Sequence, residues 1–246
     1  MSEHNLLDRG RLAGAATGEL AAGLGALIGL IMLLRYLTLS PAPLHLSALV
    51  IYLGMAGLVF HFWPARRGLG WANRVTLARG VLVALVAGTL AAPDFAERNA
   101  WAVFAIALLA LGLDGLDGLV ARRTGSETRF GARFDMELDA FFILALCLLM
   151  VLQEKAGAWV IAIGAMRYLF VLAAYAYPWL GAELPVSYRR KAVCVCQVSA
   201  LMICLLPFVT PFWSSLVLSA ALGLLALSFI LDIVRLARRA SKSVHF

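Results

Sequence analysis

The sequence predicts an all-α fold, a polytopic transmembrane helical bundle with about eight spans. Hydrophobic residues make up 63 % of the 246 residues and charged residues only 14 %, whereas soluble domains have roughly 45–50 % and about 25 %. The net charge is +7, but the basic residues recur in short clusters between long apolar runs. Cytoplasmic loops of membrane proteins have this distribution. We therefore expect a lipid bilayer around the chain and no nucleic acid as a partner.

Eight apolar stretches are long enough to cross a bilayer, which takes about 20 residues. They cover approximately residues 20–38, 46–63, 75–92, 100–120, 133–152, 158–178, 192–210 and 212–236. The first is not followed by a small-residue cleavage pattern, so we predict that it is a retained helix. Gly25 and Gly29 form a G-x₃-G pair in this stretch, a pattern that favours close helix packing.

The basic residues also predict the orientation of the spans. An even number of spans places both termini on one side. With the amino terminus in the cytoplasm, 16 of the 21 basic residues lie inside, and only Arg35, Arg98 and Lys155 lie outside. Arg79 and Arg167 fall within spans. Since basic residues concentrate in cytoplasmic loops, we predict cytoplasmic termini and polar chemistry on the cytoplasmic face.

The end of the fourth stretch carries charges that are costly in or beside the hydrocarbon and usually mark a site. At 100° per residue, five polar or small residues of this segment share one arc of about 140° on a helix. These residues are Asp114, Asp117, Gly118, Ala121 and Arg122. Small residues on such a face let a ligand approach the backbone closely.

The fifth stretch repeats this arrangement. Asp135 and Asp139 are four residues apart, about 40° from each other on a helix, and Gly131 lies one turn before Asp135. Carboxylates on adjacent helices repel one another unless cations lie between them. Oxygen ligands at this density favour Mg²⁺ or Mn²⁺, and a pair of ions is a common means of binding a diphosphate. Two alternatives stay open: helix ends solvated by lipid headgroups, and a cation-transport site.

Residues 114–139 read D-x₂-D-G-x₂-A-R-x₈-G-x₃-D-x₃-D, which resembles the signature of the CDP-alcohol phosphotransferase family. Upstream, Asn73-Arg74-Val75-Thr76-Leu77-Ala78-Arg79 is similar to the N-x₂-T-x₂-R segment that opens the first core helix in many members. The resemblance implies a six-span core over residues 72–246. Residues 1–71, with two further spans, would then be an addition to that core.

The resemblance also implies roles for these residues. Asp114, Asp117 and Asp135 would hold two metal ions, and Asp139 would be the catalytic base and a further metal ligand. The donor's nucleotide and diphosphate would be bound by Asn73, Thr76, Arg79, Gly118, Ala121, Arg122 and Gly131. An acceptor hydroxyl needs such a base to take its proton, and developing charge on the leaving CMP needs cations.

The acceptor is indicated less directly. Arg167 lies in the middle of the sixth stretch, and Ser187, Arg189, Arg190 and Lys191 open the seventh. Family members with phosphorylated acceptors have an arginine and a serine-plus-basic segment in comparable places. Many glycerophosphate-using members continue S-x₂-G-K-x-K-T, from which this chain departs.

In that register, Arg190 stands at the glycine, and Val193 and Cys194 stand at the second lysine and the threonine. This departure argues against glycerol 3-phosphate as the acceptor. We still expect Arg167 and a residue of the basic cluster to face the same cavity as Asp139. Alternatively, the cluster is an ordinary cytoplasmic loop that contacts anionic lipid.

The predicted function is therefore metal-dependent transfer of a phosphatidyl group in phospholipid biosynthesis. The donor is a CDP-lipid, CDP-diacylglycerol in our interpretation, and the acceptor is a small polar alcohol. An alternative within the family is transfer from a soluble CDP-alcohol to a lipid. With no targeting signal in the sequence, we expect a bacterial inner membrane. Homodimers are common in the family, so the resemblance allows one.

Overall fold

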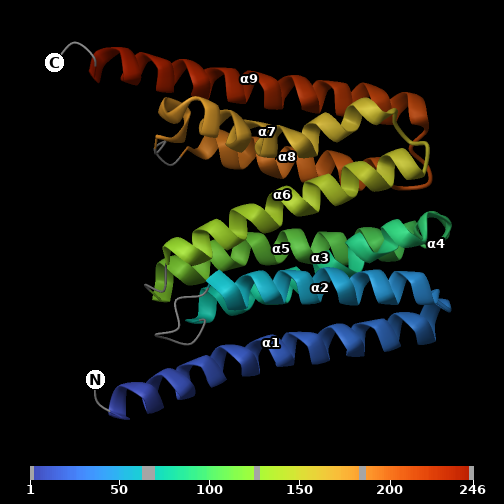
Figure 1. Ribbon diagram of the computed structural model, residues 1–246. Coiled ribbons are helices and arrows are strands. Elements are labelled where there is room, and N and C mark those ends of the chain that lie inside the picture. Colours follow the sequence, from blue (N-terminus) through green and yellow to red (C-terminus); the bar gives the residue numbers. More distant parts are fainter. Residues whose placement is uncertain (1–2, 63–69, 125–127, 183–186, 244–246) are drawn as a thin grey trace. The chain divides into compact units, whose positions relative to one another are not determined.

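The computed structural model describes residues 3–62, 70–124, 128–182 and 187–243 (Figure 1). Within these ranges, the side chains of residues 3–16, 72, 117–124, 129 and 240–243 lie outside the description. The chain divides into two compact units, residues 1–142 and 143–246. Every regular element in the described ranges is helical. The predicted all-α polytopic bundle is thus confirmed.

In the described residues, the first unit contains five α-helices, one 3₁₀ helix and the start of a sixth α-helix. They are α1 (Glu3–Thr38), α2 (Ala42–Phe62), α3 (Gly70–Gly88), the short 3₁₀ helix η1 (Thr89–Ala91), α4 (Pro93–Arg98), α5 (Ala100–Thr124) and the first part of α6 (Arg129–Leu152). The predicted first span began at residue 20, but α1 begins much earlier. Apolar composition marks the part of a helix that lies in lipid, and α1 continues beyond that part.

In the described part of the chain, five helices are long and apolar enough to cross a membrane. They cover Thr17–Thr38, Ala42–Phe62, Asn73–Ala91, Ala158–Ala176 and Pro211–Arg239. The other three predicted spans also form helices. However, α5 has an apolar stretch of Ala100–Leu116 among the residues whose side chains are described. Helix α6 carries five charged residues in its first half, and α8 (Tyr188–Cys204) has 17 residues. The chain is an integral membrane protein, and the count of eight spans stays a prediction.

Helix α3 lies at the centre of the first unit. Two thirds of its membrane-spanning window, 67 %, is buried by the protein, against 17–22 % for the other four spans. Leu77, Val81 and Leu85 on α3 join a hydrophobic cluster with residues of α1 and α2. A Cβ atom at Gly88 would lie 2.8 Å from the backbone oxygen of Leu44, so the α2 and α3 backbones are nearly in contact. The first two helices therefore cover one side of α3.

Helix α1 contacts this cluster through a different glycine from the predicted pair. A Cβ atom at Gly25 or Gly29 would meet no atom of the described chain within 4 Å, so these two glycines pack against no helix of the described chain. At Gly23, a Cβ atom would lie 2.2 Å from the hydroxyl of Tyr52, which donates a hydrogen bond to the Leu20 carbonyl at 2.8 Å. The Tyr52 hydroxyl needs a partner once it is buried in α2, and the absent side chain at Gly23 lets it reach one.

The second unit contains the end of α6, η2 (Ala158–Val160), α7 (Ile161–Ala176), η3 (Pro178–Gly181), α8 and α9 (Pro211–Ser243). Lys155, predicted to lie in an outer loop, is buried. Its ammonium group donates hydrogen bonds to the carbonyl oxygens of Leu206 at 3.2 Å and Val209 at 2.9 Å. These bonds join the loop after α6 to the loop between α8 and α9.

Candidate functional site

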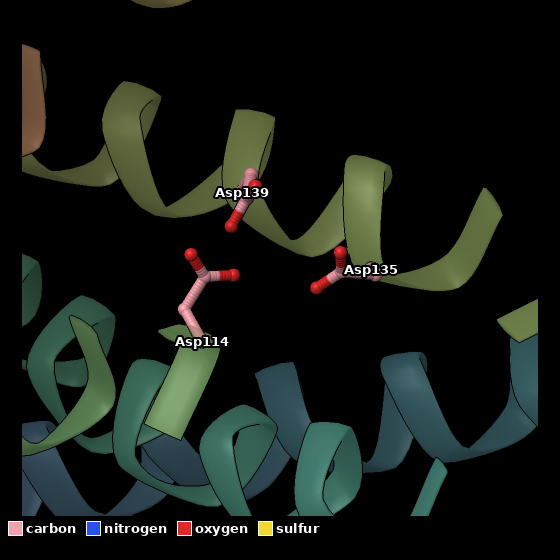
Figure 2. Close-up of side chains that lie close together, drawn as sticks. All are labelled: Asp114, Asp135 and Asp139. Atoms are coloured by element: carbon pink, nitrogen blue, oxygen red, sulfur yellow. The ribbon is translucent and has the colours of Figure 1, made fainter. Parts of the chain in front are cut away.

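Three aspartates from two helices converge in the first unit. Asp114 comes from α5, and Asp135 and Asp139 come from successive turns of α6 (Figure 2). The four-residue spacing puts the two α6 carboxylates on one face, and Figure 2 shows all three carboxyl groups directed toward one centre. Each side chain is between 27 % and 33 % exposed, so a ligand can reach them.

The guanidinium of Arg79, on α3, lies among these carboxylates and is itself only 1 % exposed. Its Nη1 atom donates to Asp114 Oδ1 at 2.6 Å and to Asp135 Oδ1 at 2.5 Å. Its Nη2 atom donates to Asp139 Oδ1. A buried arginine is tolerated only when its charge and donors are satisfied, and here three acidic groups satisfy them. The buried position of α3 thus brings a cation to the acidic face of α5 and α6.

The aspartates also suit a divalent cation. One oxygen from each carboxylate can be chosen so that all three lie within 4.8 Å of one another. Oxygen ligands about 2.1 Å from a Mg²⁺ ion lie about 3.0 Å apart when adjacent and about 4.2 Å apart when opposite. The three groups would therefore have to move inward to share one ion. The donor set is oxygen only, which suits Mg²⁺ or Mn²⁺.

The segment upstream of Arg79 borders the same place. Asn73 and Thr76 are both buried on α3. A Cβ atom at Gly131 would lie only 2.2 Å from Asn73 Oδ1, so the first turn of α6 packs directly on Asn73. The Gly131 amide donates to Thr128 Oγ1 at 2.9 Å, as in a helix N-cap. Sequence reasoning missed Thr128, although a threonine just before a helix is an N-cap signal.

A comparison with protein-family models now bears on this geometry. Residues 69–232 match the model of the CDP-alcohol phosphatidyltransferases, and this range covers α3, α5, α6 and the three converging aspartates. The chain belongs to this family. Neither the curated proteins nor the solved structures gave a match.

Family membership establishes the general chemistry, in which a phosphatidyl or phospho-alcohol group passes from a CDP-alcohol to an alcohol. The protein is thus a transferase of phospholipid biosynthesis. Members of the family typically depend on divalent metal, and the converging aspartates provide suitable ligands. The surroundings of four residues of the motif lie outside the described part of the chain. They are Asp117, a predicted metal ligand, and Gly118, Ala121 and Arg122 of the predicted donor site.

The residues predicted to bind the acceptor lie in the second unit. The Nη1 atom of Arg189 donates to the carbonyl oxygen of Ser228 at 2.7 Å and to its hydroxyl at 2.9 Å. The Nη2 atom donates to Asp232 Oδ1 at 2.5 Å. Arg190 approaches the same carboxylate at 3.9 Å. Arg189 therefore joins α8 to α9, which limits its freedom to bind an acceptor.

Asp232 is buried, and sequence reasoning missed it. An acidic residue within an apolar span was the available signal, because such residues usually have a partner or a function. Of the other predicted acceptor residues, Arg167 lies in α7, Ser187 precedes α8, and Lys191 is exposed in the first turn of α8. Their shared cavity with Asp139 stays a prediction.

Proposed function

We propose that this family member transfers a phosphatidyl group from CDP-diacylglycerol to the hydroxyl of a small polar alcohol and releases CMP. The observation that carries the proposal is the convergence of Asp114, Asp135 and Asp139 around a buried arginine. A diphosphate donor needs cations at its oxygens, and an alcohol acceptor needs a base. One carboxylate cluster can supply a base and the ligands for those cations.

In the proposed reaction, Asp139 accepts the proton of the acceptor hydroxyl. The acceptor oxygen forms a bond to the lipid-bearing phosphorus of the donor, and the bond from that phosphorus to the CMP oxygen breaks. The electron pair of the broken bond leaves with CMP. A carboxylate that acts as a general base contributes about 10²- to 10⁴-fold to the rate.

The other aspartates would hold the metal. Asp114, Asp117 and Asp135 are the proposed ligands of Mg²⁺ or Mn²⁺, together with Asp139. Two such ions, when bound, would offset the negative charge of the diphosphate and of the leaving CMP. Asn73, Thr76, Arg79, Arg122 and the small residues of the motif would hold the nucleotide and diphosphate, and Arg122 would meet charge on the leaving group.

We further propose that the acceptor alcohol carries a phosphate. The support is that three basic residues, Arg189, Arg190 and Lys191, follow one another in the first turn of α8. Arg167, in a membrane-spanning helix, adds another cation to the same unit. Guanidinium groups bind phosphate through paired hydrogen bonds that strengthen when partly buried. A neutral alcohol has no need of this charge.

The proposed setting is a bacterial inner membrane, with both termini and the aspartates on the cytoplasmic side. The support is the 16-to-3 division of basic residues between the two sides, in line with the positive-inside rule. We also propose that residues 72–246 form the family's six-span core and that residues 1–71 are an addition to it.

The test is release of CMP by the purified protein in detergent. We expect release from CDP-diacylglycerol with Mg²⁺ or Mn²⁺ when a suitable alcohol is present, and none in EDTA. The alcohol panel should pair each phosphorylated compound with its unphosphorylated form. A parallel reaction with a soluble CDP-alcohol and diacylglycerol tests the opposite direction of transfer. Activity only in that reaction would refute the proposed donor, and full activity in EDTA would refute the metal.

A further inference from the structure

Arg79 stands out in the site because it makes ion pairs with all three converging aspartates while almost none of its surface is exposed. The bonds reach aspartates on two different helices, α5 and α6, from a third helix, α3. Here the guanidinium is directed at carboxylates of the protein.

The charges explain why this arrangement is stable. Three carboxylates whose oxygens lie within 4.8 Å of one another repel strongly where the surroundings are only partly solvated. One guanidinium removes part of that repulsion and leaves these three carboxylates with a net charge of about −2 if all are ionised. Divalent cations would offset the negative charge that remains. The aspartates therefore need a positive charge at all times, and Arg79 supplies one from within the chain.

The shape of the guanidinium suits it to this task better than any other side chain. Its planar fork carries several donors with fixed directions, whereas lysine carries one compact charge. Nη1 bonds to Asp114 and Asp135, and Nη2 bonds to Asp139. Each bond ends on an Oδ1 atom, and carboxylate oxygens are also what a metal ion would require. The guanidinium and the metal thus draw on the same limited set of oxygens.

We propose that Arg79 is a resident cation: it holds the aspartates together without metal and competes with metal ions for their oxygens. The inference rests on the metal site of the proposed function and makes Arg79 a positioning residue for the aspartates. Two consequences follow. The metal-free protein is stabilised by Arg79, and each metal ion binds more weakly than the aspartates alone would allow, because it must displace guanidinium contacts.

The experiment compares Arg79→Gln with wild type, using full-length protein purified with Mg²⁺ and then stripped with EDTA. Glutamine keeps hydrogen-bonding capacity and removes the charge. The matched control is Arg74→Gln, on the same helix, since Arg74 pairs with Glu19 at 2.6 Å and lies 46 % exposed. Mn²⁺ binding is followed by the electron paramagnetic resonance signal of the free ion, and Tm is measured in EDTA and in saturating Mn²⁺.

We expect Arg79→Gln to bind Mn²⁺ at least about tenfold more tightly than wild type, a change of about 1.4 kcal/mol. Its Tm should fall strongly in EDTA and much less in saturating Mn²⁺. Arg74→Gln should match wild type in Mn²⁺ affinity. If the main variant does not fold without metal, Arg79→Lys serves in its place. Lysine keeps the charge but spans fewer carboxylates, so its Mn²⁺ affinity should also rise.

Unchanged or weaker Mn²⁺ binding by the Arg79 variants would overturn the proposal, because it would show that the guanidinium does not compete with the metal ion for the carboxylate oxygens. An equal decrease in Tm with and without Mn²⁺ would show that Arg79 contributes only to packing, and would refute the proposal. A wild-type protein that binds no Mn²⁺ would also refute the proposal. A wild-type protein that binds Mn²⁺ but releases no CMP would refute the proposed transfer reaction and leave the role of Arg79 intact.

Discussion

A single methyl group at Gly131 tests whether Asn73 has to be held in place. In Gly131→Ala, the new Cβ atom would lie 2.2 Å from Asn73 Oδ1 and 3.2 Å from Asn73 Cγ. Ordinary contact begins at 3.4 Å, so the amide oxygen has to move by about 1.2 Å, the difference between the two distances. Asn73 is only 3 % exposed, which leaves its side chain little room.

The expected result is loss of turnover with the fold retained. A misplacement of about 1 Å in a positioning group can reduce the rate by about 10²-fold. We therefore expect Gly131→Ala to lower the rate of CMP release by about 10- to 100-fold, which corresponds to about 1.4–2.7 kcal/mol in the activation barrier. Overpacking should cost about 1–3 kcal/mol of stability, visible as a lower Tm. The assay is CMP release at saturating metal, with Tm measured alongside.

Two further variants make this result interpretable. Gly57→Ala places the same methyl group in α2 where no atom of the described chain lies within 4 Å, and it should retain the wild-type rate. In the double variant with Asn73→Ala, the clash with Asn73 is removed and the milder one with Thr128 Oγ1, at 2.9 Å, is left. Its rate should therefore lie close to that of Asn73→Ala alone. A wild-type rate for Gly131→Ala, or independent effects of the two substitutions, would refute the reasoning.

Three other predictions follow from the site and the orientation. Asp139→Asn should reduce turnover at least about 10²-fold and retain donor binding, and an active Asp139→Asn protein would mean that another group is the base. Asp114→Asn should reduce turnover and also weaken Mn²⁺ binding. Arg167→Ala should raise the acceptor's KM and leave that of CDP-diacylglycerol nearly unchanged, and equal changes in both would argue against an acceptor role. Cysteines introduced at Glu97 and Glu154, which are exposed in the same two loops, should be labelled from the outer side of the membrane. Labelling from the cytoplasm would contradict the eight-span orientation.

The sequence was most informative where spacing along one helix determines the arrangement. Asp135 and Asp139 could be placed together because four residues make about one turn, and the motif linked them to Asp114. The ion pairs of Arg79 were not predictable in this way, since they join residues 35–60 positions apart. Hydropathy placed Arg79 in a span but carries no information about which helix lies beside it.

Asp232 shows the same limit in the second unit. Its partner Arg189 is 43 residues away, and periodicity links residues only within one helix. The sequence suggested a basic cluster at the start of α8, and the structure adds the carboxylate that holds part of it. In both units, the local arrangement of charges was visible in the sequence, while their pairing depended on how helices pack.

The packing of α1 and α2 on α3 has a consequence for the order in which the protein is made. Chains are synthesised from the amino terminus, so α1 and α2 are present when α3 enters the membrane. Leu77, Val81 and Leu85 can then contact protein at once. Arg79 cannot form its ion pairs at that stage, because Asp114 and Asp139 are synthesised 35 and 60 residues later. Helices α1 and α2 thus give α3 a protein surface to pack against before the aspartates that pair with Arg79 have been synthesised.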